Sequence, residues 1–424
     1  MTEPSTQNFG GAERSHATDT VRPQSNSTMA GTVSADVRGR GQELNALQVW
    51  IEISVFDHWG PKPHGIPRVT QNIFIESLRR PHLRYFYYHP IRERFVVVED
   101  PAYFLALARG ERVFNPLELP DGSMFADALS DGARGLFSAV GWDHPGYFEQ
   151  LCALRRRCPG LMVQFVVYDL IAIKYPHFFT REFGGRVQDF LRLLPLVCDR
   201  FMCISHSTAS DVRALLKEDA DTRVISIGGD VDNVDARGTD TRPTAAYPFV
   251  LCVGTLEVRK NHLLLYYVWR KLAQHLGLSC PKLVLVGRPG WLSGDVVYLL
   301  LNDPLTAHLV EIRHDVSNHE LVTLFKDCLF TVFPSFYEGW GLPAWESLFY
   351  GKVCATSNTA SLPEINPFPQ LMFDPYDHNQ AFDVIRMLIE EPDTLARYET
   401  QIPLTFRSRT WRACFDELYQ QMVA

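Results

Sequence analysis

The sequence has no excess of positive charge. Its 41 lysine and arginine residues are outnumbered by 49 aspartate and glutamate residues, so the formal net charge is −8 at pH 7. Binding of nucleic acid draws mainly on the neutralisation of phosphates by a basic surface. We therefore expect no nucleic acid among the partners of this protein.

Long apolar runs and metal-binding motifs are also absent from the sequence. No apolar segment approaches the ~18 to 20 residues that span a bilayer, and the N-terminus lacks the basic-then-apolar pattern of a signal peptide. We expect a cytoplasmic protein. None of the 14 histidines forms an H-x-x-x-H or H-E-x-x-H pattern, so no metal site is predicted. The nine cysteines form no C-x-x-C pair and several lie in apolar runs, which is typical of reduced, buried thiols.

Large apolar side chains are scarce in residues 1–46, where Ser, Thr, Gly, Asn and Gln dominate. Such a segment cannot bury enough apolar surface to offset the entropy of ordering. It is predicted to be a disordered tail.

From Val49 onward, short runs rich in Val, Ile and Phe alternate with longer segments of helical period. This alternation predicts an α/β fold, in which helices cover parallel sheets. The strands predicted in the first half are Val49–Phe56, Arg84–His89, Phe95–Val98, Met162–Tyr168, Phe201–Ile204 and Val224–Ile227. The predicted helices there are Val69–Arg80, Arg181–Leu196 and Ser207–Leu216, the last with Ser207 as its N-cap. The second half adds predicted strands at Phe249–Val253, Lys282–Val286, Leu309–Ile312, Leu329–Phe333, Val353–Thr356 and Leu371–Phe373.

The order of these elements predicts two Rossmann-like domains. A polar stretch from Asp230 interrupts the periodic pattern for about fifteen residues, which is long for an internal connection and typical of a linker. We predict a tail at 1–46, an N-terminal Rossmann-like domain at 47–229, a linker at 230–247, a C-terminal Rossmann-like domain at 248–405 and a C-terminal helix at 406–424.

One strand-loop-helix segment carries the strongest functional pattern. The loop after the strand at 330–335 contains Gly339 and Gly341, which allow sharp turns, and Pro343 suits the first position of a helix. Glu338 lies on this loop and Glu346 is predicted in the first helical turn. Backbone N–H groups at the helix start would face the crevice at the carboxyl end of the strand, a typical ligand site.

Cations for a phosphate group lie in the first strand-helix turn of the same domain. Arg259 and Lys260 follow Gly254 directly before a helix, and they fit a clamp on a diphosphate. Two further loops converge on the same sheet edge, Gly287 to Trp291 and Ser317 to Glu320, the second with capping-box spacing.

The segment Glu338-x7-Glu346, with Gly339-x-Gly341-Leu342-Pro343 inside it, closely resembles the E-x7-E motif of the retaining GT4 glycosyltransferases. The resemblance implies the GT-B fold, two Rossmann-like domains that face each other across a cleft. It also implies that Arg259 and Lys260 bind the donor diphosphate, that Glu346 binds the ribose and that Glu338 lies at the transferred sugar. Gly254, Gly339, Gly341 and Leu342 would belong to the donor site, and no metal or other cofactor is implied.

The N-terminal half resembles bacterial polysaccharide mannosyltransferases of this family in two places. One is Gly65-Ile-Pro-Arg68, which suits a loop that closes over the donor phosphates. The other is Tyr168-Asp169, where many relatives carry His-Asp. Tyr168 therefore stands where a sugar-contacting histidine is expected. Asp169 is either a carboxylate of the cleft or a structural cap.

These residues together predict a glycosyltransferase that moves a sugar, with mannose from GDP-mannose as the first guess, to a glycan or lipid-linked acceptor in surface polysaccharide synthesis. A GT-B epimerase or phosphorylase, and a catalytically silent sugar-nucleotide-binding protein, remain alternatives. A peripheral contact with the inner face of a membrane is left open, through the arginines and tyrosines at 79–88. A solvated face over buried aromatics is the other interpretation of that segment.

Overall fold

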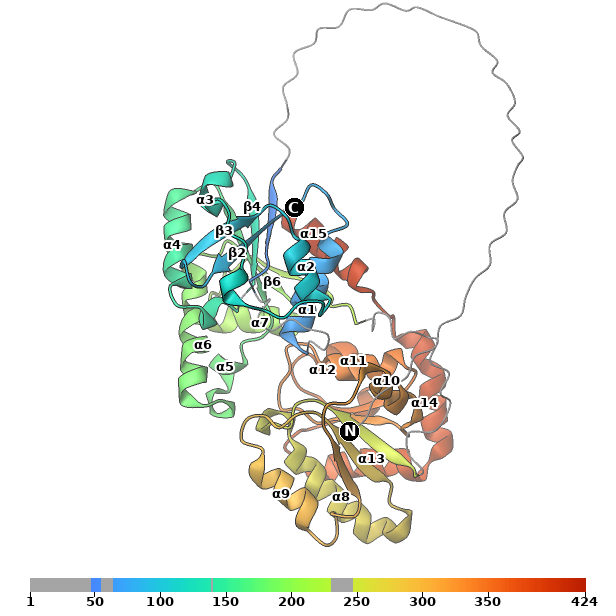
Figure 1. Ribbon diagram of the computed structural model, residues 1–424. Helices are drawn as coiled ribbons and strands as arrows, with labels where there is room; N and C mark the ends of the chain where they lie inside the picture. Colours follow the sequence, from blue (N-terminus) through green and yellow to red (C-terminus); the bar gives the residue numbers. More distant parts are fainter. Residues whose placement is uncertain (1–46, 55–63, 139, 230–246) are drawn as a thin grey trace, which may run out of the picture. The chain divides into compact units, whose positions relative to one another are not determined.

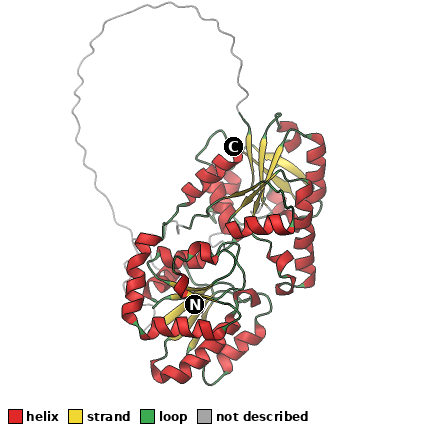
Figure 2. Cartoon of the chain, turned by 180° about the vertical axis from the view of Figure 1, so that it is seen from behind, coloured by secondary structure: helices red, strands yellow, loops and turns green. Residues whose placement is uncertain are grey.

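The computed structural model describes residues 47–54, 64–138, 140–229 and 247–424. These residues form two β-sheets with helices on both faces, as Figures 1 and 2 show. The predicted α/β class is therefore confirmed. The predicted tail and all but Tyr247 of the predicted linker lie outside the described residues.

The N-terminal sheet has the strand order β3-β2-β1-β4-β5-β6-β7 within the described part of the chain. All neighbouring strands are parallel except β2 and β3, which form an antiparallel pair. The strands are β1 (Val49–Glu52), β2 (Arg84–His89), β3 (Arg94–Val98), β4 (Arg134–Ser138), β5 (Met162–Val167), β6 (Arg200–Cys203) and β7 (Thr222–Val224). The helices are α1 (Ile66–Ser77), α2 (Ala102–Ala108), α3 (Phe125–Ala128), α4 (Tyr147–Arg157), α5 (Ile171–Lys174), α6 (Arg181–Leu193) and α7 (His206–Leu215).

Two apolar clusters cover the two faces of this sheet because successive side chains of a strand point to opposite sides. Ile51 of β1 packs in the cluster that includes Phe74 of α1, whereas the adjacent Trp50 packs in the cluster that includes Leu151 of α4. Both faces of β1 are buried, as expected for a strand in the middle of a sheet covered by helices.

The C-terminal sheet has the order β10-β9-β8-β11-β12-β13, and all its described pairs are parallel. Its strands are β8 (Phe249–Val253), β9 (Lys282–Val286), β10 (Val310–Arg313), β11 (Thr331–Phe333), β12 (Cys354–Ser357) and β13 (Met372–Phe373). Its helices are α8 (His262–Leu276), α9 (Gly294–Asn302), α10 (Asn318–Asp327), α11 (Leu342–Phe349), α12 (Leu362–Ile365), α13 (His378–Glu390) and α14 (Pro392–Thr405).

The last helix, α15 (Trp411–Val423), packs on the N-terminal sheet and not on the C-terminal one. Trp411 is 2% exposed and lies in the same cluster as Ile51 and Phe74. Arg80, which follows α1, donates to Asp416 at 2.7 Å and lies over the ring of Tyr419. The chain therefore returns to its first domain after completing the second.

Several local predictions are wrong. The strand β4 was not predicted, and β7 begins two residues earlier than the strand placed at Val224–Ile227. The N-cap of α7 is Ser205, whose hydroxyl accepts from Thr208 N, and Ser207 is already helical. The helix starts at His206, three residues after β6 ends at Cys203, so Ser205 and not Ser207 occupies the N-cap position.

Three tyrosines weighed for a membrane contact lie in the core. Tyr85, Tyr87 and Tyr88 are 6%, 0% and 0% exposed, so the interpretation of buried aromatics on β2 is confirmed. Across the described ranges, no helix has the length and apolar character needed to cross a bilayer.

Candidate active site

A cavity of about 590 Å³ is lined by residues that follow the carboxyl ends of strands from both sheets. Asp169 follows β5 of the first sheet, and Gly254 and Gly287 follow β8 and β9 of the second. Ligands of open α/β sheets bind outside the carboxyl ends of the strands, so this cavity is the expected place for one. All the predicted site residues line it: Gly65, Arg68, Asp169, Gly254, Arg259, Lys260, Glu338, Gly339, Gly341, Leu342 and Glu346. Their individual roles stay predictions.

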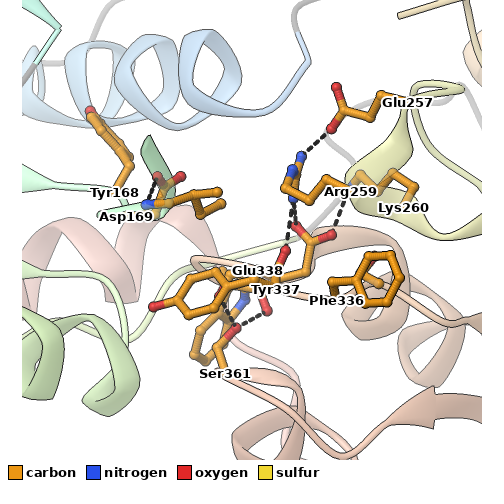
Figure 3. A network of polar contacts seen from close by, with 12 residues as sticks. Tyr168, Asp169, Glu257, Arg259, Lys260, Phe336, Tyr337, Glu338 and Ser361 are labelled. Atoms are coloured by element: carbon orange, nitrogen blue, oxygen red, sulfur yellow. Dashed lines mark hydrogen bonds and ion pairs between the residues drawn. The ribbon is translucent and has the colours of Figure 1, made fainter. Parts of the chain in front are cut away.

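Glu338 forms the centre of a buried ion cluster (Figure 3). Its two carboxylate oxygens lie 2.8 Å from a guanidinium nitrogen of Arg259 and 2.7 Å from Lys260 Nζ. Arg259 also donates to the carbonyl of Tyr337 and to the carboxylate of Glu257. The predicted diphosphate clamp is therefore already paired with two carboxylates.

The cluster shifts the pKa values of its members. Burial by itself would raise the pKa of Glu338, but the charges of Arg259 and Lys260 outweigh it and lower this pKa to about 2. Burial, together with the charge of Arg259, lowers the pKa of Lys260 in spite of its ion pair with Glu338. Glu338 is thus ionised at neutral pH inside a largely buried site.

The helix of the motif starts one residue earlier than predicted, and Glu346 lies further along it than predicted. Gly341 precedes the helix at a φ of 113°, a value that favours glycine, and Pro343 is the second helical residue. Glu346 is the fifth, so it lies in the second turn and cannot be explained as compensation of the helix dipole in the first. Its carboxylate is 4% exposed and accepts from Arg68 of α1.

Arg68 belongs to the loop predicted to close over the phosphates. Gly65 precedes α1 at a φ of 57°, and Pro67 stands in the first turn. The Arg68 side chain is 19% exposed, pairs with Glu346 across the cavity and lies 6.0 Å from the ring centre of Trp411. The N-terminal and C-terminal halves of the predicted site are therefore joined by an ion pair.

Asp169 combines both interpretations that the sequence left open. Its carboxylate accepts from the backbone N–H of Ile171 at 3.0 Å, a local turn contact directly before α5, whose N-cap position is Leu170. Asp169 also lines the cavity. Burial raises the pKa of Asp169, while the charge of Arg259 opposes this rise.

Some residues of the cavity, and one of the ion cluster beside it, were missed in the sequence analysis. Glu257 lies in the same loop as Arg259, and its acidic character beside two cations was a usable signal. Arg288 and Asp315, which pair at 2.6 Å, come from two different loops and gave no joint signal. An apolar part of the lining comes from α10 and its neighbours, Val316, Leu321, Val322, Phe325 and Tyr350.

In the described ranges, no three His, Cys, Asp or Glu side chains come together as metal ligands. None of the nine cysteines is in a disulfide; seven are buried and two are partly buried.

Comparison with known proteins gives matches in both sequence and structure. Residues 240–403 match the family model described as glycosyl transferases group 1. The O-antigen chain mannosyltransferase B of Escherichia coli is 33% identical over 129 residues, which are 30% of this chain and 33% of that protein. The serotype-specific mannosyltransferase WbdA of Escherichia coli is 27% identical over 211 residues, 45% of this chain and 25% of that protein. The chain thus spans a third or less of the length of these curated relatives.

Solved structures show the same fold. Sucrose-phosphate synthase from Thermosynechococcus elongatus has a TM-score of 0.59 at 16% identity, over 89% of this chain and 99% of that one. A trehalose-phosphate synthase from Burkholderia xenovorans has a TM-score of 0.53 at 11% identity, over 70% of this chain and 74% of that one. The predicted GT-B arrangement of two Rossmann-like domains is confirmed.

Proposed function

We propose that this chain, whose residues 240–403 form a group 1 glycosyltransferase domain, is a retaining glycosyltransferase that takes a sugar from a nucleoside diphosphate. The observation that carries the proposal is the buried cluster of Glu338 with Arg259 and Lys260 at the edge of a cavity that both domains line. Mannose from GDP-mannose is the proposed donor, because two matching proteins are mannosyltransferases. A glycan or lipid-linked acceptor of surface polysaccharide, such as lipopolysaccharide, is proposed on the same ground.

The cluster suits the charge changes of glycosyl transfer. As the bond from sugar to phosphate breaks, negative charge builds on the diphosphate and positive charge on the sugar ring. Arg259 and Lys260 stabilise the diphosphate, since fixed charges act strongly in a site shielded from water. Glu338, which is ionised at neutral pH, faces the ring as its positive charge develops. No covalent nucleophile is assigned, since the donor phosphate can itself take the proton of the acceptor hydroxyl.

Glu346 and Arg68 exchange partners in this proposal. The carboxylate of Glu346 accepts from the ribose hydroxyls of the donor, and Arg68 moves from Glu346 to a phosphate oxygen. This exchange replaces one charged hydrogen bond with another, so neither side chain is left buried without a partner.

The proposed reaction needs no divalent metal because basic side chains take the place of the cation beside the diphosphate. It takes place on the cytoplasmic side of a membrane if the acceptor is lipid-linked. Turnover that is unchanged by a metal chelator is the expected result, and a complete loss on chelation would contradict this part of the proposal.

The first experiment is a screen of GDP-, UDP-, dTDP- and ADP-sugars against the purified protein without metal. It follows thermal stabilisation and the release of free nucleoside diphosphate. Release with one donor supports a transferase and identifies its sugar. Interconversion of the donor without release would favour an epimerase, and stabilisation without any reaction would favour a silent binding protein.

Lys260→Met tests the diphosphate contact. Removal of a charge that directly contacts phosphate should weaken donor binding by roughly tenfold or more, as charge-assisted hydrogen bonds are worth ~1.5 to 3 kcal/mol. Lys271→Met is the matched control, since Lys271 lies on α8 with its ammonium on Asn379, away from the cavity. Calorimetric titration measures both, and equal donor affinities of the two variants would refute the contact.

A further inference from the structure

The loop that carries Glu338 touches the N-terminal domain on both sides of this residue. Tyr337, which precedes Glu338, and Gly339, which follows it, each contact a different segment of that domain. Glu338 itself faces the other way, towards Arg259 and Lys260 of its own domain (Figure 3).

Tyr337 reaches helix α7. Its side chain is 2% exposed, and its hydroxyl donates to the carboxylate of Asp211. The other oxygen of Asp211 accepts from Lys174 Nζ at 2.8 Å, and this ammonium lies 5.0 Å from the ring centre of Tyr337. Asp211 is 6% exposed. Lys174 and Tyr337 therefore compensate a carboxylate in a buried position.

Gly339 lies directly on the backbone of Tyr168. A Cβ atom at position 339 would lie 2.1 Å from the carbonyl oxygen of Tyr168 and 3.1 Å from Asp169 Cβ, so only glycine permits this approach. The same carbonyl of Tyr168 faces the hydroxyl of Thr208 at 3.4 Å.

The side chain of Tyr168 fixes that backbone from inside the domain. Its ring points away from Glu338 (Figure 3), and its hydroxyl lies 3.2 Å from Ser138 Oγ. Ser138 N in turn donates to Glu52 at 3.0 Å, and Tyr147 donates to the same carboxylate oxygen at 2.8 Å. Tyr168 is thus tied to the ends of β1 and β4 at the middle of the sheet.

We infer that Tyr168 and Asp211 are positioning residues, which hold Glu338 against its two cations by fixing the neighbours of Glu338 from the opposite domain. The inference rests on the proposed function only for its effect on turnover. It gives Tyr168 a role that needs no contact with the sugar, and it makes the position of Glu338 dependent on engagement of the two domains.

Hydrogen–deuterium exchange of the full-length protein tests the inference without any substrate. Tyr168→Phe and Tyr337→Phe each remove one hydroxyl and keep the ring. We expect the amides of 336–341 to exchange roughly fivefold faster in each variant, as expected for the loss of one buried hydrogen bond. The amide of Phe336, which donates to the carbonyl of Arg259 at 2.9 Å, is the most direct probe.

Tyr85→Phe is the matched control. Tyr85 is also buried in the first domain, and its hydroxyl lies 3.0 Å from that of Ser77, which belongs to α1 and not to the loop. Faster exchange at 336–341 in both test variants and not in the control supports the inference. Unchanged exchange in either test variant, or an equal rise in the control, overturns it.

Turnover gives a second readout. A purely structural role of the two residues would not lower kcat while leaving the donor Kd unchanged. Both test variants should lower kcat by roughly fivefold or more while the donor Kd stays within about twofold, because the cations that hold the diphosphate are untouched. If donor binding weakened by the same factor as kcat falls, the inference that these residues act only by positioning Glu338 would be overturned. If the wild-type protein binds no donor, the proposed function fails, whereas the exchange experiment still decides the inference.

Discussion

Glu52 should make the stability of the protein depend on pH near neutrality. Glu52 is the last residue of β1 and is 8% exposed. Among the partners that the structure shows for its carboxylate there is no cation. It accepts from Ser54, Ser138 and Tyr147. Burial raises its pKa from 4.5 to about 7, although the three hydrogen bonds oppose the rise.

The sign and size of the effect follow from this shift. Because the folded state holds the proton of Glu52 more tightly than the unfolded chain does, the contribution of Glu52 to stability is fully present below pH 4.5 and is lost as the pH rises through about 7. At ~1.36 kcal/mol for each pKa unit, the full loss is on the order of 3 kcal/mol. Glu52→Gln keeps the shape and stays neutral, so it should lack this loss.

Urea unfolding between about pH 4 and pH 8 measures the effect as the difference in unfolding free energy between the variant and the wild type. Other titrating groups cancel in this difference. It should rise in favour of Glu52→Gln by ~3 kcal/mol from the lower to the higher pH. A difference that stays flat would show that Glu52 is ionised throughout, and that the hydrogen bonds outweigh burial.

Two further predictions concern the motif loop and its helix. Gly341→Ala places a side chain at a φ of 113°, with its Cβ 2.8 Å from Leu362, and should destabilise the protein by ~1 to 3 kcal/mol in thermal unfolding. Gly351→Ala, at a φ of 77° with open space around it, should cost less, and equal costs would refute the clash. Glu338→Gln leaves Arg259 and Lys260 without their carboxylate, so it should bind nucleoside diphosphate more tightly and turn over more slowly. Titration with the diphosphate and a turnover assay measure the two effects, and weaker binding of the diphosphate would contradict the assigned charges.

The fold was predictable where apolar runs are long, and not where a strand is short. The strand β4 reads Arg-Gly-Leu-Phe-Ser, with a glycine that weakens any strand pattern. In the structure Leu136 and Phe137 enter opposite apolar clusters, and a Cβ at Gly135 would lie 2.9 Å from the ring of Phe137. Gly135, which weakens the strand pattern in the sequence, therefore leaves the space that the ring of Phe137 occupies.

The members of the candidate site were predictable because each follows a strand, and the carboxyl ends of parallel strands meet at one edge. Their pairing was not. Arg68 and Glu346 are 278 positions apart, and Tyr337 and Asp211 are 126 apart. The local sequence pattern does not show which charged side chains of the two domains meet. Arg259 and Lys260, predicted to bind a diphosphate, therefore form ion pairs with Glu338 that the sequence analysis did not predict.

The pairing explains how two cations can be kept in a buried site before any phosphate arrives. A buried charge without a partner costs several kcal/mol, so Arg259 and Lys260 alone would strain the fold. Glu338 and Glu257 supply two negative charges against these two positive ones, and the cluster is neutral. A diphosphate must therefore compete with Glu338 for the cations. Because the neighbours of Glu338 are held by the other domain, the carboxylate cannot swing away when it loses them. It stays beside the sugar, where a fixed negative charge favours bond breaking.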